Sequence, residues 1–533
     1  MKYLSVELVG AIAMNNQSTA PSSIKVDTLI DENDGNLSKG NVSLREALAA
    51  VENGGRITFA QSIASQDTGF GQGVIGLSLG TLTVDKSVTI DGLGADQLRV
   101  SGANQSSVFS INDGDDATVS NVVIKNISIT DGTADAPSGE VAAAGGGIFN
   151  REQLSVINSR ISDNSLGITG IGNNTAEATL SIENSIISGN RDGGISWMDG
   201  TIALHSSEIS NNGGKGIRLA ATTAAYDSPD NLFVHVTDTL IENNDGDGIN
   251  NAGNTQIKNS RILNNKGDGV ASFSYFGESF SVEGSTISGN SGVGLRADSD
   301  GYGSSRVKVT RSTISGNVDG SITSLGSFYS DGIELRESVV EGNGDGLLSG
   351  GLFGTKGILV ADSQIVSKQG AAVTAARITV KRSAIAQNQG IGLDGATVLV
   401  ENSSITGNTN GGIFSVSYYR GATESNVEVN NSTISGNGNR STQAGGIYSG
   451  SESDFPTFVR LKNTTISNNT GTQAGGLLIK PPEGNTIDAI DYGNAVKNTI
   501  IAANTGPDVV GSVESRWHNL IGDGSHATVF IDT

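Results

Sequence analysis

The sequence predicts an all-β fold, a single-stranded right-handed parallel β-helix (solenoid) of about 18 coils with a short N-terminal capping helix. Three observations favour it. Glycine is abundant, at 74 of 533 residues, and cysteine is absent. Short fragments such as STISGN and ENSSITGN recur through the chain. Around each fragment apolar and polar residues alternate, as expected for a strand with one buried face.

The repeat is centred on the aliphatic residue of a Ser-x-Ile fragment, which occurs fourteen times at spacings of 20 to 35 residues. The anchors are Ile161, Ile187, Ile209, Ile241, Ile262, Ile287, Ile314, Val340, Ile365, Ile385, Ile405, Ile434, Ile466 and Ile501. Each anchor has an aliphatic residue five positions before it and Ser or Thr two positions before it. Because one unit cannot bury its apolar face alone, we expect the units to stack about 4.8 Å apart around a shared core.

Asn stands three positions after the anchor in thirteen of the fourteen units, and Lys368 replaces it once. We expect these Asn residues to form a ladder inside a turn, because Asn tolerates left-handed backbone and its amide can hydrogen bond from coil to coil. Helical solenoids are excluded because the units carry too much Gly, Ser, Asn and Thr.

Three segments are expected: an N-terminal strand or arm over residues 1–24, a cap over 25–60 and the β-helix over 61–533. Residues 3–13 alternate with period two, and Glu7 interrupts their apolar run, which favours a strand over a signal peptide. No run of about 18 apolar residues is present, so no membrane-spanning helix is expected.

The cap segment carries the signals of a short helix. Ser43 is suited to begin it, and Glu46, three residues later, completes a capping box. The apolar residues Leu44, Ala47 and Leu48 would then cover the first coil and protect its edge from recruiting other strands.

Residues Val42 to Ala47 read VSLREA and precede an alternating strand. This segment resembles the CSLREA-type N-terminal segment of bacterial right-handed parallel β-helix surface proteins, with Val42 at the usual Cys position, and the following repeats are similar to the same family. The resemblance implies an extracellular or cell-surface β-helix and says little about chemistry.

The formal net charge of −22 disfavours nucleic acid and anionic membrane surfaces as partners. The absence of cysteine excludes disulfide scaffolds, thiolate metal sites and cysteine nucleophiles. Cations and glycans stay open as partners, and no organic cofactor is expected.

An enzyme is the alternative interpretation, a polysaccharide lyase or epimerase acting on an acidic glycan. The repeat register places four candidate catalytic residues on one exposed strand face: Glu183, His205, His235 and Lys258. A base, an acid and a cation there could remove a proton next to a uronate carboxylate. Scattered polar residues on a solvent-facing strand would give the same juxtaposition, and the Asp-Pro step found in alginate epimerases is absent.

Aromatic residues give the candidate ligand-binding site. They recur at a similar phase in the longer loops, which would place them along one edge of the rod: Tyr302, Phe328, Tyr329, Phe353, Tyr418, Tyr419 and Tyr448. The coils anchored at Ile365 and Ile385 are too short for such a loop and should leave a notch. Exposed aromatic rows contact sugars or another protein surface, although each ring could instead anchor its own loop.

Asp residues recur in the turn after the Asn ladder, and four of them should stack in pairs as a candidate calcium site: Asp247, Asp268, Asp319 and Asp345. Calcium favours clustered carboxylate oxygens. The alternative is that these side chains are solvated turn residues that confer solubility.

The function predicted from these observations is that of an extracellular structural or adhesive rod that binds a glycan or associates with itself. The chain finishes with alternating Val529 and Ile531, without a recognisable cap. We therefore expect that the N-terminal strand of one copy could add to the last coil of another. A longer parent protein, or a terminus folded over its own end, would explain the same pattern.

Overall fold

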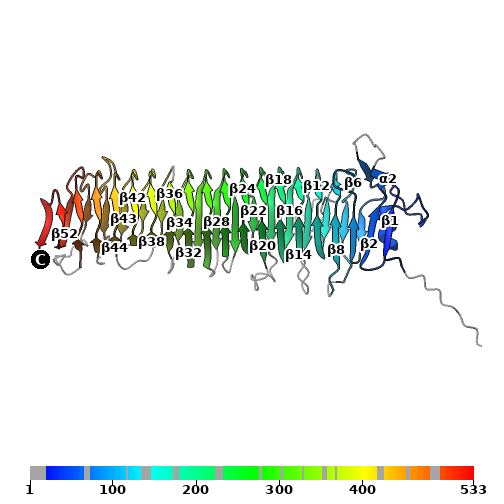
Figure 1. Ribbon diagram of the computed structural model, residues 1–533, viewed down its shortest axis with the longest axis horizontal. Coiled ribbons are helices and arrows are strands. Elements are labelled where there is room, and N and C mark those ends of the chain that lie inside the picture. The colour runs from blue at the N-terminus through cyan, green and yellow to red at the C-terminus, as the bar shows by residue number, and fades with distance from the viewer. Residues whose placement is uncertain are drawn as a thin grey trace, which may run out of the picture.

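The fold is a single long rod of stacked coils, with the N-terminal cap at one end and the last strands at the other (Figure 1). The computed structural model describes residues 20–64, 72–115, 118–133, 146–171, 179–221, 232–274, 279–299, 304–326, 329–350, 357–366, 369–416, 425–451, 457–480 and 493–532. The strand expected at residues 3–13 lies outside these ranges. All named strand pairs are parallel, which confirms the predicted parallel β-helix.

Each regular coil contributes three strands, one to each of three faces. The first face consists of β1 (Ser23–Val26), β2 (Gly55–Phe59), β5 (Val88–Asp91), β8 (Asn121–Lys125), β11 (Gln153–Ile157), β14 (Thr179–Glu183), β17 (Thr201–His205), β20 (Phe233–Thr237), β23 (Asn254–Lys258), β26 (Ser279–Glu283), β29 (Ser304–Thr310), β32 (Tyr329–Arg336), β35 (Ile358–Ala361), β38 (Arg377–Lys381), β41 (Thr397–Glu401), β44 (Ser425–Asn430), β47 (Thr457–Lys462) and β50 (Ala495–Lys497).

The second face contains the repeat anchors and has eighteen strands among the described residues, in agreement with the number of coils expected. They are β3 (Gly73–Gly76), β6 (Leu98–Ser101), β9 (Ser128–Thr130), β12 (Arg160–Ser162), β15 (Ile186–Ser188), β18 (Glu208–Ser210), β21 (Leu240–Glu242), β24 (Arg261–Leu263), β27 (Thr286–Ser288), β30 (Thr313–Ser315), β33 (Val339–Glu341), β36 (Gln364–Val366), β39 (Ala384–Ala386), β42 (Ser404–Thr406), β45 (Thr433–Ser435), β48 (Thr465–Ser467), β51 (Ile500–Ala502) and β53 (Leu520–Ile521).

The third face follows the Asn turn. It consists of β4 (Leu82–Val84), β7 (Phe109–Ile111), β10 (Ile148–Asn150), β13 (Ile168–Ile171), β16 (Gly193–Met198), β19 (Lys215–Ala220), β22 (Ile249–Asn251), β25 (Val270–Ser274), β28 (Val293–Ser299), β31 (Gly320–Gly326), β34 (Leu347–Gly350), β37 (Val373–Thr374), β40 (Leu393–Asp394), β43 (Ile413–Val416), β46 (Ile447–Gly450) and β49 (Leu477–Ile479). At the C-terminal end β52 (Val509–Arg516) pairs with both β49 and β50, and β54 (His526–Asp532) pairs with β52.

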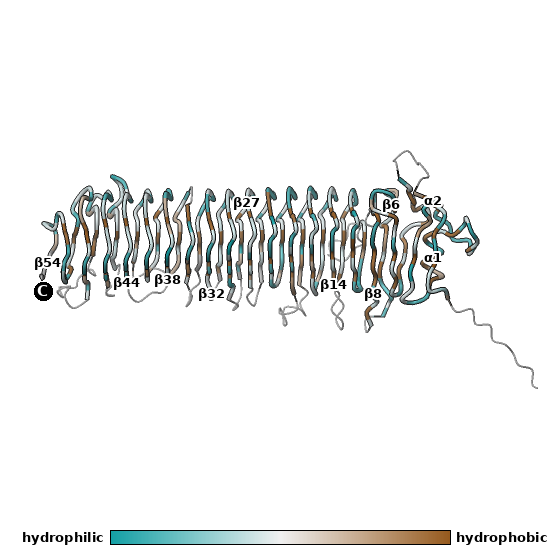
Figure 2. Tube along the Cα trace, viewed as in Figure 1, coloured by the Kyte–Doolittle hydropathy of each residue, from teal (hydrophilic) through white to brown (hydrophobic). Residues whose placement is uncertain are grey.

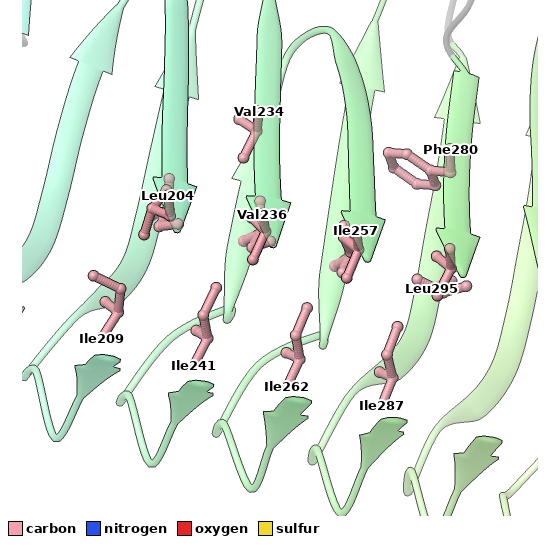
Figure 3. Close-up of a cluster of buried hydrophobic side chains, with 14 of the residues drawn as sticks. Leu204, Ile209, Val234, Val236, Ile241, Ile257, Ile262, Phe280, Ile287 and Leu295 are labelled. Carbon is pink, nitrogen blue, oxygen red and sulfur yellow. The ribbon is translucent and has the colours of Figure 1, made fainter. Parts of the chain in front are cut away.

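The core is a stack of aliphatic side chains that repeats from coil to coil. All fourteen anchors have 0% exposed surface. The aliphatic residue five positions earlier stacks in the same way, since Val156 aligns with Ile182 and Ile182 with Leu204. Figure 2 shows the apolar positions at the same place in successive coils, and Figure 3 shows Ile209, Ile241 and Ile262 stacked below the strands of the first face. This apolar column supplies most of the burial that drives folding.

The predicted Asn ladder is present and buried. The side chain of Asn190 donates to the side-chain oxygen of Asn212 at 2.9 Å, and Asn212 donates to Asn244 at 2.9 Å. One part of the expectation was wrong, because the left-handed residue is the one before the ladder Asn: Asn211, with φ of 55°, precedes Asn212. The turn needs its positive φ there, so that the following Asn can direct its amide into the stack.

The cap helix α1 (Leu44–Ala50) is confirmed, as is its capping box between Ser43 and Glu46. Leu44, Ala47 and Leu48 are buried, and α1 packs against β1 and β4. The rod begins earlier than the residue 61 expected for it. Its first strand, β1, crosses the expected start of the cap at residue 25, and its second strand, β2, lies within the expected cap segment 25–60. A second short helix is α2 (Gln61–Ala64), and in the described part of the chain neither helix is long or apolar enough to cross a membrane.

Candidate functional site

The candidate catalytic residues share one exposed face, as the register predicted. Glu183 pairs with His205, His205 with Thr237 and Thr237 with Lys258 on neighbouring strands β14, β17, β20 and β23. His235 pairs with Ala203, and Ala203 lies two residues before His205 in β17. The sequence therefore placed these residues correctly relative to one another.

Their side chains do not converge on one point in the part of the chain that the structure describes. Glu183 accepts a hydrogen bond from the amide of Asn184 at 3.4 Å. The ring of His205 lies 3.8 Å from Asp238, and both side chains are about half exposed. His235 contacts Gln256 at 3.2 Å and stacks on Phe233, with 4.6 Å between ring centroids. Glu183, His205 and His235 thus each have a separate partner on an open surface.

The four candidate calcium ligands lie in the turns that precede the third face. Asp247 and Asp268 are stacked, and an oxygen of Asp247 accepts the backbone N–H of Asp268 at 3.0 Å. Each of the two carboxylates also meets a cation, Lys215 at 3.1 Å and Arg296 at 2.7 Å respectively. These cations offset the repulsion that calcium was expected to relieve.

Asp319 and Asp345 are exposed. Among the described residues no group of three or more acidic or histidine side chains is arranged to hold a metal ion. Calcium binding at these turns stays a prediction.

The aromatic site divides into residues within and outside the described ranges. Tyr302, Phe328, Phe353, Tyr418 and Tyr419 lie outside them. Tyr329 begins strand β32, and Tyr448 lies in strand β46 of the third face rather than in a loop.

The two short connections expected at the rod edge between the third and first faces are present, whereas the flanking segments 351–356 and 417–424 lie outside the described residues, so the notch itself stays a prediction. Only two residues connect Thr374 in β37 to Arg377 in β38, and two connect Asp394 in β40 to Thr397 in β41. The coils anchored at Ile365 and Ile385 therefore carry no side loop at this edge.

A pocket that the sequence reasoning missed lies beside these short coils. Phe414 in β43 and Tyr448 in β46 are aligned on adjacent strands, and their rings stack with centroids 4.7 Å apart and an angle of 16° between planes. Both side chains are partly exposed. With Ile391 and Ile413 they form the apolar wall of a pocket of about 220 Å³.

The other wall of the pocket is polar and comes from two turns. The side-chain amide of Asn439 donates to the carbonyl of Thr409 at 2.8 Å and to the side-chain oxygen of Asn410 at 3.3 Å. The backbone N–H of Ser441 donates to the side-chain oxygen of Asn439 at 2.7 Å, and the backbone N–H of Asn439 to the hydroxyl of Thr442 at 3.1 Å. These bonds fix the turn over the aromatic pair.

The pocket is uncharged. None of its eleven described lining residues is acidic or basic, and the remaining polar contact group is the amide of Gln443. Amides and hydroxyls both donate and accept hydrogen bonds. The site is therefore suited to a neutral ligand with one apolar surface and several hydroxyl groups.

A better alignment of the sequence could have found this pair. Ile413 lies eight residues after Ile405, whereas Ile447 lies thirteen residues after Ile434, because the turn around Asn439 is longer. Counting from the Ser-x-Ile anchor Ile434 therefore assigned Tyr448 to a loop. Counting from the next aliphatic residue of each coil, Ile413 or Ile447, places Phe414 and Tyr448 at the same position, one residue later.

Comparison with solved structures gave only distant likenesses among those described next. No curated protein matches the chain. The catalytic unit of a thermostable GH87 alpha-1,3-glucanase from Streptomyces thermodiastaticus is 15% identical, with a TM-score of 0.34 over 70% of this chain and 65% of that chain. An alginate lyase complex is 12% identical, with a TM-score of 0.19 over 96% of this chain and 89% of that chain. These likenesses are too distant to bear on activity.

The family comparison is more informative. The model of the right-handed β-helix region matches residues 80–233 and 223–365, which together make up more than half of the chain. The chain therefore belongs to the right-handed β-helix family.

Proposed function

We propose that this protein is an extracellular structural or adhesive rod that binds a glycan, and that a neutral sugar unit occupies the pocket beside Phe414 and Tyr448. The observation that carries the proposal is the combination, in one pocket, of two stacked aromatic rings with uncharged amides and hydroxyls. A sugar ring has C–H groups on its faces and hydroxyls around its rim. Aromatic faces suit the former, and amides suit the latter.

The extracellular location is supported by the sequence rather than by the pocket. The VSLREA segment resembles that of bacterial surface β-helix proteins, and a cysteine-free acidic chain suits an exposed environment. A rigid rod with short strands on every face also suits an adhesive or structural role, because its surface can present binding sites at fixed spacing.

The lyase or epimerase interpretation has weaker support. It depends on Glu183, His205, His235 and Lys258, which lie on an open face, and the first three of these side chains have separate partners. Proton removal next to a carboxylate needs a base and an acid held within hydrogen-bonding reach of one substrate atom. Incubation with alginate and pectin tests it, since a lyase would produce unsaturated products that absorb in the ultraviolet.

Binding of a neutral glycan panel to the purified chain tests the proposal. Phe414→Ala should weaken binding roughly two- to tenfold, since an aromatic contact contributes ~0.5–1.5 kcal/mol beyond its buried area. Phe414→Leu keeps apolar packing on Tyr448 but removes the flat ring, so it should weaken binding without loss of folding. Phe233→Ala removes a stacked aromatic ring outside the pocket and serves as the control. Equal binding by Phe414→Ala and Phe233→Ala, or no neutral glycan bound at all, would reject the pocket.

A further inference from the structure

The last rungs of the first face carry an unusual column of positive charge. Lys462 in β47 pairs with Lys497 in β50, and Lys497 pairs with Arg516 in β52. Neighbouring parallel strands lie about 4.8 Å apart, so three cations are stacked directly on one another. Arg460 lies on the outward face of β47, two residues before Lys462.

These cations have few carboxylate partners in the described part of the chain. Arg516 forms an ion pair with Glu514, but Arg460, Lys462 and Lys497 have no described carboxylate within 4.0 Å. Glu428 is aligned with Arg460 on the preceding strand without forming an ion pair with it. Among the described residues, four cations therefore face two carboxylates, in a protein whose net charge is −22.

Two other cations of the first face show the opposite arrangement. Lys381 lies opposite Glu401 on the next strand, with 2.9 Å between their charged atoms. Arg306 reaches Glu334 on the next strand at 3.4 Å. These two cations are thus neutralised from coil to coil, whereas like charges directly opposite each other destabilise a sheet. The column at Lys462, Lys497 and Arg516 keeps an electrostatic cost that a bound anion would offset.

Two aromatic rings accompany the column. The ammonium of Lys497 lies 3.6 Å from the centroid of the Trp517 ring, and the guanidinium of Arg460 lies 5.4 Å from that of Phe458. Trp517 is 60% exposed and has a left-handed φ of 54°. Large residues rarely adopt this conformation, so the backbone holds an exposed indole beside the cations at a conformational cost.

We propose that these residues, called the cationic strip (Phe458, Arg460, Lys462, Lys497, Arg516 and Trp517), bind a carboxylate-bearing glycan that lies along the rod axis. Arginine can bind carboxylates through two parallel hydrogen bonds, and lysine supplies a point charge. The exposed indole surface suits a sugar ring. Since the charges repeat once per rung, successive uronate units of an extended chain could each meet a cation.

A nucleic acid fits these observations less well. Proteins that bind DNA commonly neutralise about 6–10 phosphates. The cationic strip offers four cations, flanked by two carboxylates in the part of the chain that the structure describes, on an acidic rod.

The cationic strip lies on the first face of the rod, whereas the neutral-sugar pocket lies on the third face. The two proposals can therefore fail independently.

Calorimetric titration with a pentamer of galacturonate, at 20 and 200 mM NaCl, tests the proposal. The native chain should bind the pentamer at low salt and bind it more weakly at high salt, because exposed charges are screened. The methyl-esterified pentamer, which lacks the charges, should bind at least ~5-fold more weakly. The double variant Lys462→Gln/Lys497→Gln should lose about tenfold in affinity at low salt. Lys308→Gln removes one positive charge, half the change of the double variant, from the same face next to Glu334, and should change affinity by less than ~2-fold.

Two further measurements distinguish loss of binding at the cationic strip from a folding defect and from binding at the neutral-sugar pocket. Lys462→Gln relieves like-charge repulsion, so its melting temperature should not fall below that of the native chain. Phe414→Ala should bind the pentamer normally. The proposal is overturned if the pentamer does not bind at low salt, if its methyl ester binds equally well, or if Lys308→Gln weakens binding as much as the double variant. Tighter binding of a single-stranded oligonucleotide of equal charge would also overturn it, in favour of a nucleic-acid site.

Discussion

The buried Asn ladder makes a sharp prediction for stability, because each amide holds the next coil in place. Asn290 has 0% exposed surface. Its side-chain oxygen accepts both the backbone N–H and the side-chain amide of Asn265, each at 3.0 Å. Its own amide donates to the carbonyl of Ile262 at 3.3 Å and to the side-chain oxygen of Asn317 at 2.9 Å.

Asn290→Ala leaves two donors of Asn265 without this acceptor inside the rod. A buried donor without a partner costs about 1–3 kcal/mol, so the variant should lose about 2–6 kcal/mol of unfolding free energy. Asn290→Asp keeps the acceptor but buries a charge, and it should be at least as destabilising. Ser291→Ala changes the next residue, which is exposed, and should stay within ~0.5 kcal/mol of the native chain.

Guanidinium unfolding followed by circular dichroism gives the change in midpoint for these variants. Hydrogen exchange adds a local test, because solenoid coils interact only with their neighbours. The backbone amide of Asn265 should exchange faster in Asn290→Ala, while that of Asn437, many coils away, should not change. If Asn290→Ala and Ser291→Ala unfold at the same midpoint, the ladder does not stabilise the rod in the way inferred here.

Three further predictions concern charge, metal and assembly. The hydrogen bond from Arg336 lowers the pKa of Glu334 from its usual 4.5, against burial, which raises it, and Lys308 and Arg306 lower it further. Because the folded-state pKa is the lower one, this carboxylate stabilises the fold fully above about pH 4.5 and loses that contribution as pH falls through the lowered value. Glu334→Gln should therefore melt at a lower temperature than the native chain at pH 7, and this difference should shrink as the pH falls below 4.5. A difference in melting temperature that stays constant with pH would contradict this. If calcium binds at Asp247 and Asp268, the melting temperature should be higher with calcium than with a chelator. Equal melting temperatures would contradict calcium binding at these turns. End-to-end association predicts joined rods in negative-stain micrographs, whereas uniform single rods at high protein concentration would count against it.

The sequence predicted the regular part of the fold well because the repeat is short and local. The anchors and the aliphatic positions five residues earlier occupy the buried places expected for them. The register also placed Glu183 beside His205 and Lys258 two rungs beyond, since parallel strands in a solenoid advance one coil at a time. The capping box of α1 was equally predictable, because Ser43 and Glu46 interact within one helical turn.

Positions after a variable turn could not be predicted in the same way. The longer turn around Asn439 moves Tyr448 out of phase with its anchor, so its neighbour Phe414 was not recognised. The partners of Asp247 and Asp268 were also missed. Lys215 and Arg296 lie in other coils and reach these carboxylates only through their long side chains.

The spacing of aliphatic residues, Ser or Thr, and Asn was by itself sufficient to determine the winding of this chain, because each coil must bury the same narrow apolar stripe against the next. Tertiary structure decided where the surface becomes chemically distinctive. Turn lengths differ from coil to coil, and they set which outward side chains meet. This is why the aromatic pocket and the cationic strip, each built from several coils, emerge only when the coils are stacked.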